Sequence, residues 1–337
     1  MIKKKIAIFY GTRPEYLKLK NIIRLIPSKR RDVIFVGQHN ELIHKNYFKK
    51  KIKLSNSNDK NRLNSIISQI TNKIHINNYD YVIIQGDTAT TFAVAISAFN
   101  TKRKIIYVES GLRTFDFNNP FPEEGYRQMI SRIADIHLCP TELSKKNLIS
   151  EKTDGKIFIS GNTSLDNLLV YKKDIEYTEL VLITLHRREN LSLMSNWFLE
   201  LNKIATKYKD IKFIFPIHKN IEIKKHKKIL KNIEVIENLS HEKFMKIFVK
   251  AKLIITDSGG VQEEASFLNK KVIVCRKFTE RPEGIKSGHL HLCHHPKLLM
   301  NSFKKLNKNF RINKKSPYGD GRASKKIIKF LSSQKIL

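Results

Sequence analysis

The sequence predicts an α/β protein whose two halves each contain a doubly wound parallel sheet. Its 337 residues match the length of about two domains, and 41% hydrophobic residues supply enough apolar side chains for two cores. Short apolar runs that favour strands alternate with patterns of helical spacing along most of the chain. This alternation implies parallel strands joined by right-handed helical crossovers.

The first half begins with an apolar run over residues 3–10, which ends in Gly-Thr-Arg-Pro. Helical spacing follows through residue 26, and a second predicted helix covers residues 91–99. Further predicted strands cover residues 32–36, 81–85, 104–108 and 156–160.

The second half repeats the pattern after Gly161-Asn162-Thr163. Its predicted strands cover residues 180–185, 212–216, 253–256 and 271–275. The polar stretch around Tyr171 lacks strand character, which places the boundary near residues 163–178. We therefore expect domains over residues 1–168 and 169–320, followed by a C-terminal helix within residues 321–337.

The net charge is the most misleading feature of the composition. With 64 Lys and Arg against 31 Asp and Glu, the chain carries 33 excess positive charges, which suggests nucleic-acid binding. However, the lysines are spread over the whole chain, and no zinc-finger, bZIP or RRM signature is present. Nucleic acid is therefore not the expected partner.

Membrane and disulfide classes also fit poorly. No apolar run approaches the ~18 to 20 residues needed to span a bilayer, and the apolar stretch near the first residue is too short for a signal peptide. Cys139, Cys275 and Cys293 lie far apart, so neither a disulfide framework nor a zinc ribbon is predicted. These features favour a cytoplasmic location.

Charged residues follow the predicted strands of the first half, at the sheet edge where α/β proteins bind ligands. Arg13 lies in a Gly-Thr-Arg-Pro-Glu turn that suits an anion, or that is simply an exposed strand-to-helix turn. Asp87 is either a catalytic carboxylate or a helix N-cap, whereas Glu109 has little structural use after an apolar strand. Glu123 fits a helix start, where it would form an i,i+4 ion pair with Arg127.

The second half offers a candidate phosphate cradle. Gly259 and Gly260 follow a strand at a predicted helix start, where backbone N–H groups bind phosphate. Neither a Walker A motif nor G-x-G-x-x-G occurs. His186 and His218 also follow strands, and each is either a site residue or a surface histidine. The histidines between 289 and 295 lack a partner cluster with zinc spacing, so we expect no metal.

Ten short motifs run in a fixed order through nearly the whole chain. They are G-T-R-P-E (11–15), Q-G-D-T (85–88), V-E-S-G-L-R-T (108–114), P-E-E (122–124), P-T-E (140–142), G-N-T (161–163), H-R-R-E-N (186–190), D-S-G-G-V-Q-E-E (257–264), T-E-R-P-E (279–283) and P-Y-G-D-G (317–321). This set closely resembles the bacterial UDP-N-acetylglucosamine 2-epimerases of the non-hydrolysing type.

The resemblance implies a GT-B architecture, in which two Rossmann-like domains enclose an active-site cleft and the second domain binds UDP. It also implies reversible conversion of UDP-GlcNAc to UDP-ManNAc through elimination of UDP, a 2-acetamidoglucal and re-addition. No cofactor is implied, and a homodimer is expected. A hydrolysing 2-epimerase, a 2-epimerase of another UDP-sugar and a GT-B glycosyltransferase remain as alternatives.

The same resemblance assigns roles to individual residues. The implied catalytic residues are Asp87, Glu109, Glu123 and His186. The implied substrate-binding residues are Arg13, Lys18, Arg127, His218, Ser258, Gly259, Gly260, Glu264 and Arg281. An activator site for a second UDP-GlcNAc would include Gln38, His39 and Glu41, although Asn40 replaces the usual arginine there. Tyr126 also departs from the asparagine that is common in the family.

Overall fold

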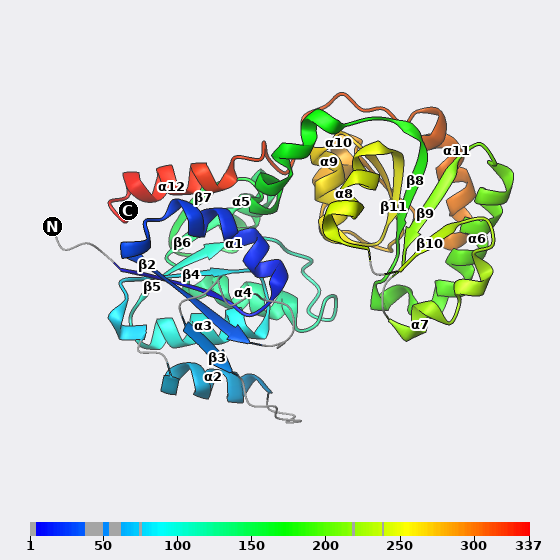
Figure 1. Cartoon of the computed structure of the whole chain (residues 1–337). Coiled ribbons are helices and arrows are strands. Elements are labelled where there is room, and N and C mark those ends of the chain that lie inside the picture. The colour runs from blue at the N-terminus through cyan, green and yellow to red at the C-terminus, as the bar shows by residue number, and fades with distance from the viewer. Residues whose placement is uncertain (1–4, 38–49, 54–61, 74–75, 218–219, 238) are drawn as a thin grey trace. The chain divides into compact units, whose positions relative to one another are not determined.

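The computed structural model describes residues 5–37, 50–53, 62–73, 76–217, 220–237 and 239–337. The chain divides into two compact units (Figure 1). Unit 1 comprises Met1–Asn167 and Gly319–Leu337, and unit 2 comprises Leu168–Tyr318. The C-terminal helix is therefore part of unit 1.

Unit 1 is built on a parallel sheet whose described strands follow the order β3-β2-β1-β4-β5-β6-β7. These strands are β1 (Ile6–Tyr10), β2 (Arg31–Gly37), β3 (Lys50–Lys53), β4 (Tyr81–Gln85), β5 (Lys104–Val108), β6 (Ile136–Cys139) and β7 (Lys156–Ile159). In the register of the sheet, Ile8 of β1 pairs with Val33 on one side and Ile83 on the other. The order reverses between β1 and β4, which makes this pair the switch point of the sheet.

Helices cover both faces of this sheet (Figure 1). They are α1 (Arg13–Leu25), α2 (Arg62–Lys73), α3 (Ala89–Asn100), α4 (Glu123–Ile133), α5 (Glu142–Ser150) and α12 (Ala323–Ser333). Ile6, Ile8 and Tyr10 of β1 belong to the core formed with α1 and α12. Ala7 and Phe9 point the other way, into the core formed with α2, α3 and α4. Burial of both faces explains why this strand reads as an unbroken apolar run.

Unit 2 contains a second parallel sheet, with the strand order β10-β9-β8-β11-β12-β13 in its described part. The strands are β8 (Thr178–Thr184), β9 (Lys212–Pro216), β10 (Glu234–Ile236), β11 (Ala251–Thr256), β12 (Lys271–Val274) and β13 (Leu290–Leu292). The helices are α6 (Met194–Lys207), α7 (Ile221–Lys224), α8 (His241–Lys250), α9 (Gly259–Phe267), α10 (Pro282–Ser287) and α11 (Leu299–Lys308). Here the switch point lies between β8 and β11. The predicted α/β class with two parallel sheets is thus confirmed.

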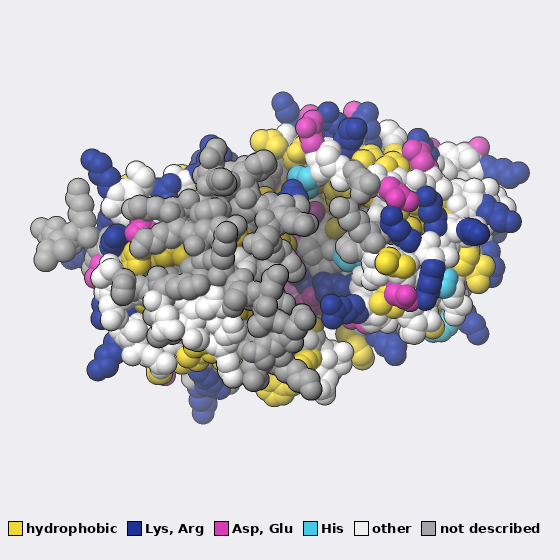
Figure 2. All heavy atoms as spheres, turned by 60° about the horizontal axis from the view of Figure 1, so that its bottom comes forward, with side chains coloured by type: hydrophobic (Ala, Val, Ile, Leu, Met, Phe, Trp, Pro, Cys, Tyr) yellow, Lys and Arg dark blue, Asp and Glu magenta, His cyan; other side chains and the backbone are white. Residues whose placement is uncertain are grey.

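The surface reflects the basic composition. On the part of the face that Figure 2 draws in colour, lysine and arginine side chains are scattered and do not form one continuous patch. Within the described ranges, no helix has both the length and the apolar character needed to cross a bilayer.

Candidate functional site

Charged side chains of unit 1 gather where its central strands end. Asp87 follows β4, Glu109 follows β5, and Glu123 begins α4. Lys18 of α1 and Arg127 of α4 bring two cations to the same place, where Lys18 pairs with Glu109 and Arg127 pairs with Asp87. The charges of Lys18, Arg127, Glu109 and Glu123 all contribute to the pKa of Asp87. The structure therefore brings together five residues that the sequence places in one site.

Glu109 is held in an unusual backbone conformation. Its φ is +66°, in the left-handed region that residues other than glycine rarely adopt and that is often found at functional sites. Its carboxylate accepts hydrogen bonds from Nζ of Lys18, at 2.7 and 2.5 Å, and from the side-chain amide of Gln85. The carboxylate is thus fixed beside a cation, with 8% of the side chain exposed.

Asp87 does not cap the following helix. Thr88 is the N-cap of α3, and its hydroxyl accepts a hydrogen bond from the amide of Thr91. Oδ2 of Asp87 lies 3.3 Å from Nη1 of Arg127. Burial raises the pKa of Asp87, and the negative charges of Glu109 and Glu123 raise it further, whereas Arg127 and Lys18 oppose the shift. A carboxyl group balanced in this way suits proton transfer closer to neutral pH.

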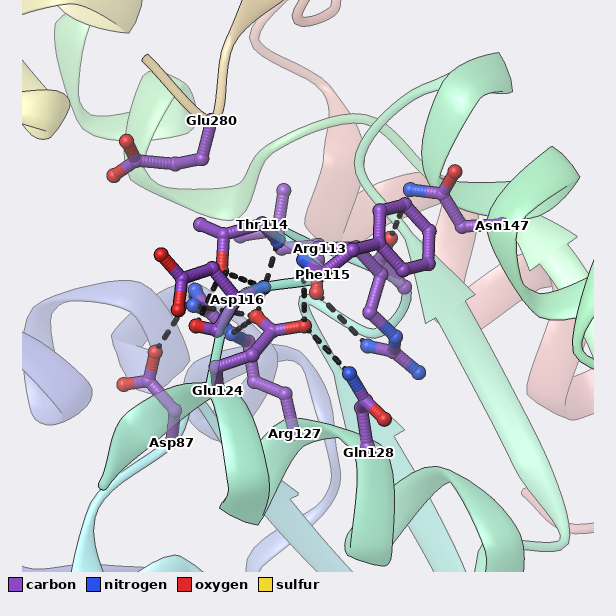
Figure 3. A network of polar contacts seen from close by, with 12 residues as sticks. Asp87, Arg113, Thr114, Phe115, Asp116, Glu124, Arg127, Gln128, Asn147 and Glu280 are labelled. Atoms are coloured by element: carbon purple, nitrogen blue, oxygen red, sulfur yellow. Dashed lines mark hydrogen bonds and ion pairs between the residues drawn. The ribbon is translucent and has the colours of Figure 1, made fainter. Parts of the chain in front are cut away.

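Glu124 organises the loop that leads from β5 to α4, a role that the sequence did not reveal. Its buried carboxylate accepts hydrogen bonds from the amides of Thr114 and Phe115, at 3.1 and 3.2 Å, and from Gln128 at 2.9 Å. It also lies 2.9 Å from Nη2 of Arg127. Figure 3 shows Arg127 between Glu124 and Asp87. Glu124 therefore sets the orientation of the arginine that neutralises Asp87.

The predicted i,i+4 ion pair between Glu123 and Arg127 is wrong. Arg127 instead pairs with Glu124 and Asp87. Oε2 of Glu123 is buried and has no hydrogen-bond partner within the described parts of the chain. A buried carboxylate oxygen without a partner is rare, because such groups normally form hydrogen bonds.

In unit 2, the loop after β8 is attached to the loop after β11 by one buried carboxylate. Asp257 accepts hydrogen bonds from the amides of His186 and Arg187, at 3.0 and 2.9 Å, and from the side chain of Asn190 at 3.0 Å. Nδ1 of His186 lies 3.8 Å from Oδ1 of Asp257, and about a third of this histidine is exposed. Asp257 follows a strand, so the same signal that indicated Asp87 and Glu109 could have found it.

The N-terminus of α9 has the features of the predicted phosphate cradle. Ser258 is its N-cap residue and makes no side-chain capping bond to the helix. A methyl group on Gly259 would come within 2.6 Å of the guanidinium of Arg281, whereas one on Gly260 would meet no atom within 4 Å. Gly259 thus lets Arg281 lie against the helix end, and Gly260 leaves open space in front of the backbone.

Arg281 belongs to a network of buried ion pairs. Its Nε lies 2.7 Å from Glu263, and its Nη1 contacts Glu280, which also pairs with Arg276 at 2.7 Å. Burial would raise the pKa of Glu280, but the charges of Arg281 and Arg276 outweigh it and hold this pKa well below its usual value. The network fixes Arg281 in place before any ligand binds.

The other predicted residues are placed as follows. Arg13 is exposed at the first turn of α1, and Glu264 lies partly buried on α9. His218 and the predicted activator residues Gln38, His39 and Glu41 lie outside the described residues. Among the residues that are described, no group of three or more His, Cys, Asp or Glu side chains is arranged to hold a metal ion.

Comparisons with known proteins agree over nearly the whole chain. A family model described as UDP-N-acetylglucosamine 2-epimerase matches residues 28–332. The UDP-N-acetylglucosamine 2-epimerase of Campylobacter jejuni is 36% identical over 97% of this chain and 97% of the relative. That of Salmonella borreze is 34% identical over 98% of each. The structure of UDP-GlcNAc 2-epimerase from Neisseria meningitidis bound to UDP-GlcNAc has a TM-score of 0.83 and 30% identity, and covers 98% of this chain and 100% of that one.

Proposed function

The chain belongs to the UDP-N-acetylglucosamine 2-epimerase family, and from this premise we propose that it interconverts UDP-GlcNAc and UDP-ManNAc without releasing the sugar. The observation that carries the proposal is the set of three carboxylates, Asp87, Glu109 and Glu123, gathered with two cations at the strand ends of unit 1. The relative from Neisseria meningitidis, whose structure holds UDP-GlcNAc, supports this choice of substrate.

Inversion at C2 needs a base on one face of the sugar and an acid on the other. In the proposed elimination, the bond between C1 and the diphosphate oxygen breaks and its electron pair leaves with UDP. A carboxylate removes the C2 proton, and a C1–C2 double bond forms. UDP then returns to C1 while C2 receives a proton on the opposite face. Carboxyl groups in different environments suit these two tasks.

The environments of the three carboxylates differ in this way. Glu109 is paired with Lys18, Asp87 has a raised pKa beside Arg127, and Glu123 has an oxygen without a partner in the described structure. In unit 2, the open N-terminus of α9 and the fixed Arg281 supply the positive potential that stabilises a departing diphosphate. We assign UDP contacts to Ser258, Gly259, Gly260, Glu264 and Arg281, with Arg13, Lys18, Arg127, His186 and His218 as further substrate-facing residues.

The proposal is tested with Asp87→Asn, Glu109→Gln and Glu123→Gln, assayed for UDP-ManNAc formation and for UDP affinity. Each variant should lower kcat by at least about 100-fold, because the acid or base is lost, while UDP binds within about threefold of the wild type. Glu242→Gln, at an exposed position on α8, is the matched control and should leave kcat unchanged. Turnover close to that of the wild type in all three variants would refute the assignment.

A further inference from the structure

The buried carboxylate of Glu15 joins the two loops that flank the switch point of unit 1. Its Oε2 accepts hydrogen bonds from the amides of Gly11 and Thr12, at 2.5 and 2.9 Å, in the loop after β1. Its Oε1 accepts a hydrogen bond from the hydroxyl of Thr88, at 2.6 Å, after β4, and lies 3.4 Å from the hydroxyl of Thr91. Glu15 is 4% exposed, so water competes little for these bonds.

The contacts around Glu15 lead directly to the charged cluster. The hydroxyl of Thr91 also donates to the carbonyl oxygen of Gln85, whose side chain reaches Glu109. The loops touch closely as well, since a methyl group on Gly11 would come within 2.6 Å of Oγ1 of Thr90. A shift of one loop therefore displaces the other.

Three site residues depend on the position of these loops. Asp87 lies immediately before Thr88, and Arg13 immediately after Thr12. Lys18 is three residues beyond Glu15 on α1, so both side chains project from the same face of that helix. Glu15 fixes the first turn of α1 against the loop of Asp87, and this also sets where Lys18 can reach.

The same device occurs in unit 2, where it is built from different residues. Asp257 joins the loop after β8 to the loop after β11, which again flank the switch point of the sheet. A buried carboxylate that accepts hydrogen bonds from one strand-end loop while it is anchored on the other is thus a repeated feature of the chain. Glu15 also completes the capping box of α1, so its contact with Thr88 is the part of the arrangement that reaches beyond the local turn.

We propose that Glu15 is a positioning residue that holds Asp87, Lys18 and Arg13 in the geometry of the reaction and takes no part in proton transfer. The kinetic part of this inference rests on the proposed function. The geometric part, which concerns how firmly the two loops are held in place, does not rest on the proposed function.

Replacement by glutamine separates positioning from proton transfer. In Glu15→Gln, the amide oxygen can accept from the two backbone N–H groups, and the amide nitrogen can donate to the two threonine hydroxyls. Those hydroxyls can accept, because Thr91 already donates to Gln85 and Thr88 lies 3.1 Å from the hydroxyl of Thr91. The glutamine variant therefore keeps every contact between the loops and removes only the charge.

We expect Glu15→Gln to keep kcat within about threefold of the wild type, whereas Glu15→Ala lowers kcat by about 100-fold because the reacting groups are misplaced. UDP affinity should change by less than about tenfold in both, since most proposed UDP contacts lie in unit 2. Glu242→Gln is again the exposed control. Equal loss of kcat in the glutamine and alanine variants, or no loss in either, would overturn the proposal.

Hydrogen exchange of backbone amides distinguishes a failure of this inference from a failure of the proposed function. If the wild type does not act on UDP-GlcNAc, the proposed function fails, and exchange in residues 8–15 and 85–92 then decides the role of Glu15. Faster exchange in both segments of Glu15→Ala, with wild-type exchange in Glu15→Gln, supports the positioning role. Unchanged exchange in Glu15→Ala would overturn it.

Discussion

The Nζ atom of Lys18 donates hydrogen bonds to both carboxylate oxygens of Glu109, at 2.7 and 2.5 Å. Lys18 is on α1, whereas Glu109 follows β5, ninety-one residues later in the chain. The pair joins a helix beside β1 to a strand end on the far side of β4. The pair thus lies on both sides of the strand that precedes Asp87, and the charges of Lys18 and Glu109 both affect the pKa of Asp87.

Replacing Lys18 with methionine should remove this charge while keeping most of the side chain. We expect kcat to fall by about 100-fold, because the carboxylate loses the cation that fixes and balances it. Steady-state kinetics of UDP-ManNAc formation will measure the effect. Lys146→Met, at an exposed position on α5, should retain wild-type turnover. A kcat of Lys18→Met within threefold of the wild type would contradict the role of the pair.

The pH dependence of turnover should respond to Arg127. Its positive charge lowers the pKa of Asp87 against the effect of burial, so Arg127→Gln should raise that pKa. If Asp87 reacts as a carboxylate, activity is lost as the pH falls through its pKa, and the acidic limb of the kcat profile will move to higher pH. Arg132→Gln, on the exposed side of the same helix, should leave the limb in place. A limb that stays in place in both variants would exclude Asp87 as the group that titrates.

The two glycines at the start of α9 should differ when each is changed to alanine. In Gly260→Ala, the new methyl group meets no atom within 4 Å outside the backbone of its own helix, so stability should not fall. UDP affinity should nevertheless fall by about tenfold or more, because the methyl group occupies the space where phosphate approaches the backbone. In Gly259→Ala, the methyl group displaces Arg281 and lowers the melting temperature as well. Calorimetry of UDP binding and of thermal unfolding tests both variants. Unchanged UDP affinity in Gly260→Ala would argue against a phosphate cradle at the N-terminus of α9.

The free energy of unfolding of unit 2 should rise with pH above neutrality because of Lys270. Its side chain is fully buried, its Nζ donates to the carbonyl oxygen of Glu176, and it lies 4.0 Å from the ring centre of Tyr177. Burial lowers the pKa of Lys270 to about 7. Between that pH and about 10.4, the unfolded chain binds a proton that the folded chain does not, so the free energy of unfolding rises by ~1.4 kcal/mol per pH unit.

Urea denaturation at pH 7.5 and pH 9.5 tests this dependence. The wild type should gain about 2 to 3 kcal/mol between these values relative to Lys270→Met, which cannot titrate. Lys243→Met, at an exposed position on α8, should behave like the wild type. The same pH dependence in the wild type and Lys270→Met would show that this lysine is charged in the folded protein.

Much of the fold could be predicted because the central strands are buried on both faces. The strands Tyr81–Gln85, Lys104–Val108 and Lys212–Pro216 were predicted to the residue, and the family resemblance is confirmed. The strands that escaped prediction are short or interrupted by polar residues. β3 reads Lys-Lys-Ile-Lys at the edge of its sheet, where lysines are typical, and β6 contains the buried His137.

The candidate site could be predicted only in part. Asp87 and Glu109 were identifiable because each follows a strand, and the structure places them together. The partner of Arg127 could not be identified from the sequence. Glu124 and Glu123 lie three and four residues before it, and both spacings allow contact on a helix. The roles of Glu15 and Asp257 depend on which strands are neighbours, and local sequence patterns do not contain that information.

The most direct test of the proposed reaction is proton NMR of the protein with UDP-GlcNAc in D2O. We expect deuterium to enter C2 of a sugar that remains attached to UDP, together with the appearance of UDP-ManNAc. Free UDP with free ManNAc would instead indicate the hydrolysing reaction. Retention of the C2 proton with no new sugar would contradict epimerisation of UDP-GlcNAc.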